Sequence, residues 1–263
     1  MGNPFTYNAF VYRRTSDGEL VPMEVMMYDE NGDLQTITCG PIAPMQGFFV
    51  HLTEETTVSF RGRAHINDYV DLGLPSGLLW ATCNVGADSP EDYGDYFAWG
   101  ETTPKDTYNW STYQYCNGSQ NTMTKYCNNS NYGYEGFTDD LTTLLPEDDA
   151  ATANWGSGWR MPTEEEWQEL YNNTTVTWTT QNGVSGRLFT ASNGNSLFLP
   201  AAGYRYNSSL YNAGYGIFWS SSLYTGTPGF AWYFSFGSGN YGMYDTYRSS
   251  GQSVRPVRSA SQN

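Results

Sequence analysis

The feature that most constrains the fold is a close succession of short apolar runs and turn residues, which fills the chain from Val176 onward. Short apolar or alternating runs separated by Gly, Asn and Ser are typical of antiparallel strands. The Asn182-Gly183 pair is a strong hairpin signal. The candidate strands are Val176–Thr179, Leu188-Phe189, Leu197–Leu199, Ile217–Trp219, Ala231–Phe236 and Ser253–Val257. The C-terminal part is therefore expected to be antiparallel β.

Two helices are predicted before this β-rich part. Pro146–Asn154 carries acidic residues in its first turn, where the helix dipole favours them. A second helix begins after Thr163, because Thr163 as N-cap and Glu166 at the third helical position form a capping box. Its expected buried face consists of Trp167, Leu170 and Tyr171. Two short helices with many strands and long loops indicate the α+β class.

Composition divides the chain into two expected units. Residues 1–62 read as a small all-β module, either the tail of an upstream β-sandwich-like domain or a module docked on the next one. A chain this short is marginal for an independent core. The second unit spans 68–258. Within it, residues 103–135 are rich in Asn, Tyr, Ser and Thr without periodicity, which predicts a long surface excursion.

Charge and composition exclude several classes of protein. The chain has 12 Lys+Arg against 27 Asp+Glu, a net charge of −15. Nucleic-acid binding depends on basic patches, so it is not expected. No apolar run approaches the roughly 18 residues of a transmembrane helix. The first residues, Met1–Pro4, lack the regions of a signal peptide, so any export signal is expected to be absent from this chain. Few Lys and many Tyr, Gly, Asn, Ser and Thr favour an extracellular or cell-surface location.

Catalytic and metal-binding motifs are missing from the sequence. There are two histidines, His51 and His65, and there is no HExxH, G-x-S-x-G or Walker motif. The pairs Asp139-Asp140 and Asp148-Asp149 are interpreted as acids at helix starts rather than metal ligands. We expect no enzyme, no cofactor and no metal. The four cysteines leave two interpretations, a loop-closing bridge between Cys116 and Cys127 or four small buried hydrophobes.

Seven short blocks stand in order along the second unit: Leu74–Ala87, Gly94–Thr102, Asp148–Ala151, Trp159–Thr163, Leu197–Gly203, Trp219–Ser222 and Gly251–Arg258. Together they resemble the Fibrobacter succinogenes major paralogous domain, which is common in Bacteroidota. The resemblance covers roughly 68–258 and implies a C-type lectin fold of the formylglycine-generating-enzyme type. The chain departs from the oxidase branch of that fold, because no Cys follows Cys127. It also lacks the Glu-Pro-Asn, Gln-Pro-Asp and Trp-Asn-Asp motifs of calcium-dependent lectins.

The composition of residues 204–247 carries a narrower resemblance. This segment contains no Glu, Lys or Gln, where the chain-wide frequencies predict about four. It holds nine of the 22 tyrosines, and its only charged residues are Arg205 and Asp245. Such a segment resembles the variable part of proteins diversified by diversity-generating retroelements. There, adenine mutagenesis of Asn codons yields Tyr, Ser, Asp, Gly, Thr, Ile and Phe, but not Glu, Lys or Gln.

Tyrosine suits a binding surface, since it offers a rigid face and a hydroxyl at low entropic cost. The predicted ligand-binding residues are Tyr204, Tyr206, Asn207, Tyr211, Tyr215, Tyr224, Phe230, Tyr233, Tyr241, Tyr244, Asp245 and Tyr247. The nine tyrosines are expected on one contiguous face, with Trp219 and Trp232 packed inward. Arg255 is interpreted as structural. The predicted partner is a protein or other macromolecule. The alternative is a fixed glycan-binding or structural module, in which the tyrosines are ordinary sheet residues.

Overall fold

The computed structural model describes residues 12–14, 20–22, 24–28, 34–38 and 68–260. The chain divides into two compact units, 1–64 and 65–263. In the first unit two antiparallel hairpins are described, and they pair β1 (Tyr12–Arg14) with β2 (Leu20–Pro22) and β3 (Glu24–Tyr28) with β4 (Leu34–Thr38). Cys39, His51 and His65 lie outside the described residues.

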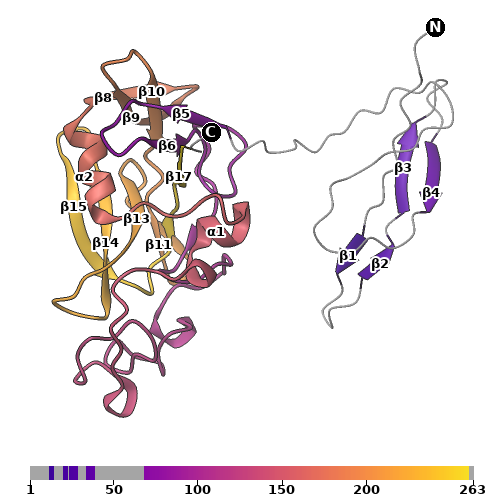
Figure 1. Ribbon diagram of the computed structural model, residues 1–263. Coiled ribbons are helices and arrows are strands. Elements are labelled where there is room, and N and C mark those ends of the chain that lie inside the picture. The colour runs from indigo at the N-terminus through magenta and orange to yellow at the C-terminus, as the bar shows by residue number, and fades with distance from the viewer. Residues whose placement is uncertain (1–11, 15–19, 23, 29–33, 39–67, 261–263) are drawn as a thin grey trace, which may run out of the picture. The chain divides into compact units, whose positions relative to one another are not determined.

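The second unit is mostly β, with two α-helices (Figure 1). Its strands are β5 (Tyr69–Asp71), β6 (Leu78–Ala81), β7 (Tyr96–Phe97), β8 (Thr175–Gln181), β9 (Val184–Thr190), β10 (Ser196–Pro200), β11 (Tyr204–Tyr206), β12 (Ser209–Tyr211), β13 (Gly216–Leu223), β14 (Phe230–Phe236), β15 (Tyr241–Tyr247), β16 (Gln252–Ser253) and β17 (Val257–Ser259). The helices are α1 (Ala150–Trp155) and α2 (Glu164–Asn172), with 3-10 turns η1 (Trp110–Thr112), η2 (Tyr134–Gly136) and η3 (Pro146–Asp148).

Four sheets organise the second unit. The largest has the order β15-β14-β13-β16-β7, with β15 at one edge. Two three-stranded sheets, β10-β9-β8 and β17-β6-β5, and the β11–β12 hairpin complete the set. The pairs are antiparallel except β13 with β16, which is parallel. The sequence predicts two short helices with antiparallel sheets, and the structure has both. The α+β class is therefore confirmed.

Local signals in the sequence place α2 and the β8–β9 hairpin correctly. The Thr163 side chain accepts a hydrogen bond from the Glu166 backbone N–H, and the Glu166 carboxylate accepts one in return from Thr163. Asn182 and Gly183 both have positive φ, 48° and 84°, as a two-residue primed turn requires. The predicted helix over 146–154 is instead η3 followed by α1. Asp149 separates them, because its extended backbone and its side-chain bond from Thr152 N–H make it the N-cap of α1.

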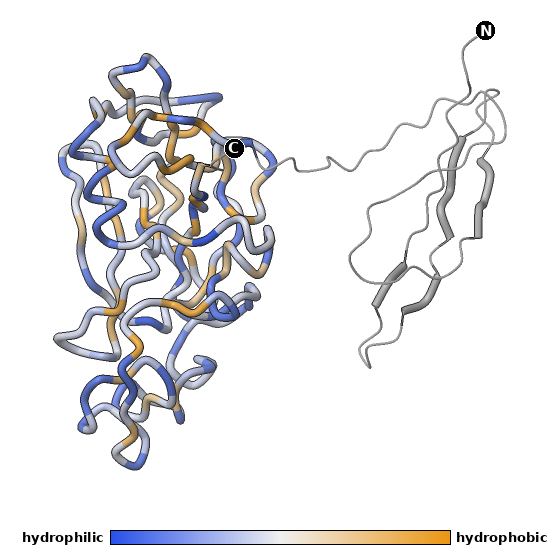
Figure 2. Tube along the Cα trace, viewed as in Figure 1, coloured by the Kyte–Doolittle hydropathy of each residue, from blue (hydrophilic) through white to orange (hydrophobic). Residues whose placement is uncertain are grey.

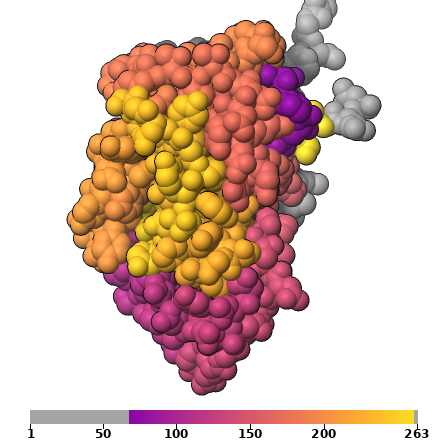
Figure 3. All heavy atoms as spheres, turned by 90° about the vertical axis from the view of Figure 1, so that its left-hand side faces the viewer, coloured from indigo at the N-terminus to yellow at the C-terminus, as the bar shows by residue number. Residues whose placement is uncertain are grey.

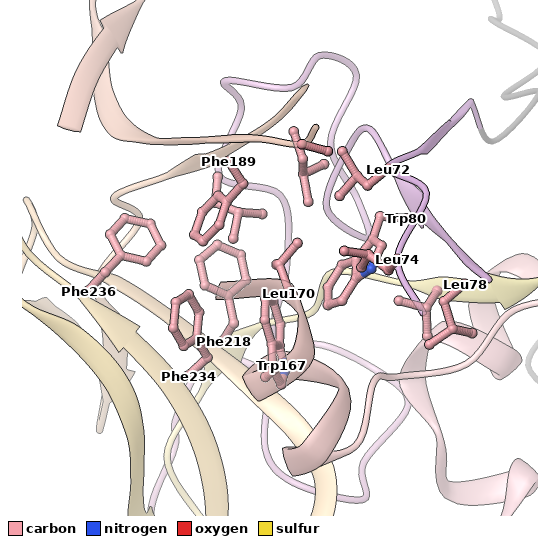
Figure 4. Packing of buried hydrophobic residues seen from close by; sticks show 14 of the residues in the cluster. Leu72, Leu74, Leu78, Trp80, Trp167, Leu170, Phe189, Phe218, Phe234 and Phe236 are labelled. Atoms are coloured by element: carbon pink, nitrogen blue, oxygen red, sulfur yellow. The ribbon is translucent and has the colours of Figure 1, made fainter. Parts of the chain in front are cut away.

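Side chains on both faces of β13 are buried. On one face Phe218 and Phe234 meet α2, where the Trp167 ring stacks on Phe234 at 4.9 Å between centroids (Figure 4). On the other face Trp219 packs in a second cluster with Trp99. Figure 2 shows that hydrophilic residues are concentrated along the outer loops of this unit. Because it is packed on both faces, the central part of this sheet is a rigid support for the edge strand β15 and for the loops beside it.

Residues 103–135 form an irregular segment that is mostly exposed or half-buried, as their composition predicts, but several of its side chains anchor it to the core. Tyr108, Tyr113, Met123 and Cys127 are buried in a third cluster, and Tyr126 enters the second. The segment has no strand or α-helix, so no periodicity reveals which side chains turn inward. The thiols of Cys116 and Cys127 are free, and each donates to a backbone carbonyl. A bridge between these two residues is therefore not formed, and buried Cys127 behaves as a small hydrophobe.

Candidate binding surface

The β11–β12 hairpin presents the first group of predicted residues. Tyr204 lies opposite Tyr211 in the strand register, and their rings stack with centroids 5.8 Å apart. Tyr206 contacts the same Tyr211 ring at 6.3 Å. Asn207, at φ 50°, starts the tight turn of the hairpin and is exposed. Three aromatic rings are thus held together at the surface by one short hairpin.

The β14–β15 pair presents the second group. Tyr233 lies opposite Tyr244 with ring centroids 6.1 Å apart, and Phe230 lies opposite Tyr247 at 4.8 Å. Tyr224, in the loop before β14, contacts Phe230 at 6.5 Å. These pairs follow directly from the antiparallel register, because opposed residues share a face of the sheet.

The strand register divides the tyrosines between two sides of β15. Tyr244 lies on the side of Tyr233, whereas Tyr241 and Tyr247 fall on the opposite side because side chains alternate along a strand. Tyr241 packs instead against Tyr171 of α2 and beneath the Arg187 guanidinium. The expected single face is therefore replaced by a surface that wraps around the edge strand, with β15 at the centre of the view in Figure 3.

Exposure separates the predicted site from the scaffold. Six of the nine tyrosines are 40–49% exposed. They are Tyr206, Tyr211, Tyr215, Tyr241, Tyr244 and Tyr247. Tyr204, Tyr224 and Tyr233 are half-buried, as are Phe230 and Asp245. None of the nine tyrosines is buried, while the interleaved Phe234 and Phe236 are.

Trp219 and Trp232 differ in burial, although both are expected from the sequence to pack inward. Trp219 is fully buried, and its indole N–H donates to the Phe97 carbonyl at 2.8 Å. Trp232 is half-buried and packs edge-to-face on Tyr224 at 5.2 Å. The reason is an irregularity in β13, where the register shifts between Trp219 and Leu223. Residues 220–222 at this irregularity are serines, and Ser220 donates to the Trp232 carbonyl, so β13 offers no large side chain to the Trp232 ring.

The surface is almost uncharged. The Arg205 guanidinium stacks over the Tyr96 ring at 5.2 Å, and Asp245 lies opposite Trp232. Burial, then the nearby Asp245 carboxylate, raises the pKa of Tyr233, so its hydroxyl stays neutral at physiological pH. Neutral hydroxyls donate and accept hydrogen bonds without the desolvation cost of ions. The chemistry that this surface offers is aromatic contact and neutral hydrogen bonding.

Arg248 is the important residue that sequence reasoning missed. Its guanidinium is fully buried, donates to the carbonyls of Lys125, Tyr126 and Pro228 and to the Tyr113 hydroxyl, and lies 4.8 Å from the Trp99 ring centroid. It therefore ties the end of β15 to segment 103–135. Most of these partners lie more than a hundred residues earlier, so no local signal announces them. Arg255, predicted to be structural, is likewise buried and donates to Asn84 and two carbonyls.

Asp139-Asp140 lies in a loop, not at a helix start as predicted, and Asp139 accepts from the backbone N–H groups of Tyr126, Cys127 and Leu141. The Asp148-Asp149 pair lies at the start of α1. Asp149 accepts from the backbone of Thr152 and Met161, and Asp148 accepts from Lys125, Tyr115 and Tyr126. Within the described residues, no group of three or more His, Cys, Asp or Glu is arranged to hold a metal. A cavity of about 390 Å³ beside the hairpin is lined in part by Asp95, Lys105 and Arg205. No helix in the described part of the chain has the length and apolarity to cross a membrane.

Comparison with known proteins gives one result. Residues 189–257 match a family described as a domain of unknown function, DUF8237. This match contains the whole of segment 204–247 and covers about a quarter of the chain. No curated protein and no solved structure matches the chain.

Proposed function

We propose that this chain is a ligand-binding surface protein, a receptor or adhesin, whose segment 204–247 is diversified by a diversity-generating retroelement. The observation that carries the proposal is the agreement between composition and exposure in this segment. All nine tyrosine positions reach solvent, while Trp219, Phe234 and Phe236 between them are buried. Exchanges at such positions leave the core intact, because surface substitutions usually change stability by only about 0.5 kcal/mol.

The proposal includes the finer fold assignment. The order of the seven blocks supports a C-type lectin-like fold of the formylglycine-generating-enzyme type for roughly 68–258. In this fold the block Gly251–Arg258 follows the variable segment and returns the chain to the core through β16 and β17, which pair with β7 and β6. A scaffold that resumes immediately after the variable segment holds that segment at both ends.

The proposed ligand is a macromolecule outside the cell, bound without metal or covalent chemistry. The exposed tyrosines are spread over β11, β12, β15 and the loops beside them rather than converging in one cavity. Small metabolites favour enclosed pockets, whereas a broad aromatic surface suits a protein partner. Tyrosine, glycine, serine and asparagine are also the residues that antibody loops use for this purpose.

The diversification is tested by sequencing the DNA that flanks the coding region. The proposal predicts a reverse-transcriptase gene and a near-copy of the segment encoding 204–247, with Asn codons at the tyrosine positions. A native locus without such a near-copy would refute diversification. The chain would then be better described as a fixed glycan-binding or structural module.

A further inference from the structure

Segment 103–135 contacts segment 204–247 along one side. The backbones of Tyr108 and Asn207 exchange two hydrogen bonds, of 2.9 and 2.8 Å, and the Asn109 amide donates to the Asn207 side chain at 2.9 Å. The Asn128 amide donates to the Thr225 carbonyl at 3.1 Å. Segment 103–135 therefore contacts both the hairpin turn and the loop between β13 and β14.

The third contact is aromatic. The Trp110 ring, at the start of η1, meets Tyr247 edge-to-face with centroids 5.7 Å apart. Tyr247 in turn packs on Phe230 at 4.8 Å. Trp110 is half-buried, with its inner side against Tyr113 at 5.6 Å. Trp110 thus continues the row of partly exposed rings formed by Tyr247 and Phe230. Figure 3 shows the magenta surface of segment 103–135 adjoining the yellow surface of β15.

Segment 103–135 is also held rigidly. Buried Arg248 follows Tyr247 directly and binds the carbonyls of Lys125 and Tyr126. Tyr113 and Tyr126 flank its guanidinium at 5.3 and 5.7 Å. Because Arg248 lies one residue beyond the variable window, its ties persist whichever residues stand in that window. These bonds, and the backbone bonds between Tyr108 and Asn207, do not depend on the side chains at the nine tyrosine positions.

We propose that segment 103–135 is a fixed flank of the binding surface, with Trp110 as a contact residue common to all variants. This inference rests on the proposed function. The proposed partner is a folded protein. A chain of net charge −15 repels the phosphates of nucleic acids, and the cavity beside the hairpin is not lined by Trp110, Phe230 or Tyr247. A broad, nearly uncharged row of aromatic rings matches the core of a protein interface, where tryptophan is prominent among energetic hot spots.

The experiment uses a display library of the full chain. The nine tyrosine codons are randomised to those that adenine mutagenesis of Asn codons produces. Binders are selected separately against immobilised lysozyme, streptavidin and carbonic anhydrase. Trp110→Ala is then introduced into several binders to each target. The matched control is Trp155→Ala, since Trp155 is also half-buried but belongs to α1, on the side of the unit away from β15 (Figure 1).

The inference predicts that Trp110→Ala weakens binding at least tenfold in most binders to all three targets, while Trp155→Ala changes it less than threefold. Hydroxyl-radical footprinting of the unsubstituted binders gives a second readout that needs no variant. There, Trp110 should be protected on complex formation and Trp155 should not.

Two results overturn the inference, and they are distinguishable. If binders emerge but Trp110 is neither sensitive to substitution nor protected, the flank is not part of the site and the proposed function stands. If the library yields no binder to any target, the proposed function fails and the inference fails with it.

Discussion

At the residue scale, position along a strand decides which tyrosines are free to vary. Phe234 and Phe236 alternate with Tyr233 and Ser235 on β14, and only the two phenylalanines enter the main core. The same alternation makes Tyr233 and Tyr244 neighbours across the strands. Site and scaffold are therefore interleaved residue by residue, and the cost of a substitution should change abruptly between adjacent positions.

We predict that Tyr206→Ser leaves stability nearly unchanged, whereas Trp219→Ala lowers the free energy of unfolding by about 3–5 kcal/mol. Tyr206 is 42% exposed, but Trp219 is fully buried with its indole N–H bonded to Phe97. Thermal melts of the two variants beside the parent chain decide this. Comparable losses in both would show that Tyr206 belongs to the scaffold.

A second residue-scale prediction concerns the buried guanidinium of Arg248. Arg248→Met should cost about 3 kcal/mol or more, because three buried carbonyls lose their donor together. Arg205→Met is the matched control and should cost less than about 1 kcal/mol, since Arg205 is half-buried, its guanidinium lies over the Tyr96 ring, and its backbone bonds to Gly251 are kept in the variant. Urea denaturation measures both. Equal costs would mean that segment 103–135 does not depend on Arg248.

A third prediction is the pH dependence of the Asp148 network. Burial alone would raise the pKa of Asp148, but hydrogen bonds from Lys125, Tyr115 and Tyr126 outweigh it and hold the pKa below its ordinary value. A lowered pKa in the folded state gives stability that is present above about pH 4 and is lost as the carboxylate protonates at lower pH. The stability difference between the parent and Asp148→Asn should therefore be largest near neutral pH and shrink below about pH 4 in denaturation series. A difference that is constant with pH would contradict it.

At the element scale, the sequence predicts those elements whose signals are local. The capping box at Thr163 places the start of α2, and Asn182-Gly183 places the β8–β9 turn. The sequence pattern does not predict the strands β11, β12 and β15, because strings of Tyr, Gly, Asn and Ser show no alternation of apolar and polar residues. These strands form through backbone pairing, β11 with β12 and β15 with β14, rather than through a local sequence pattern.

The same distinction explains the errors in the candidate site. The predicted residues all fall on exposed or half-buried positions of the second unit, yet their division between two sides of β15 depends on register. The exposure of Trp232 depends on an irregularity in β13. The anchoring of segment 103–135 next to β15 involves Arg248, whose carbonyl partners Lys125 and Tyr126 lie in that segment. Such contacts between residues distant in sequence cannot be predicted from one chain by periodicity.

An element-scale prediction follows for α2. Thr163→Ala removes the side-chain acceptor of the capping box and should lower stability by about 1 kcal/mol. Thr177→Ala, at an exposed position of the edge strand β8, is a control with no cap to lose and should have a smaller effect. Chemical denaturation compares them. A Thr163 loss no greater than the control loss would show that tertiary packing alone fixes the start of the helix.

At the scale of the whole molecule, a strongly acidic chain carries an almost neutral surface at the proposed binding site. Arg205 and Asp245 offset each other within segment 204–247, so electrostatic steering inside the site should be slight. The neutral hydroxyls and rings of this surface impose no fixed charge on a partner. Under the proposed function, this arrangement would let one scaffold serve many ligands, because specificity would change with the surface residues while the core and Arg248 remain.

The central claim is that the exposed tyrosine positions are sites of diversification, and deep sequencing of the segment encoding 204–247 across a natural population tests it most directly. The account predicts replacements at the nine tyrosine positions, drawn from the residues that mutated Asn codons can encode. It predicts invariance at the buried Trp219, Phe234 and Phe236. Replacements spread equally over buried and exposed positions, or tyrosine positions as constant as the core, would contradict it.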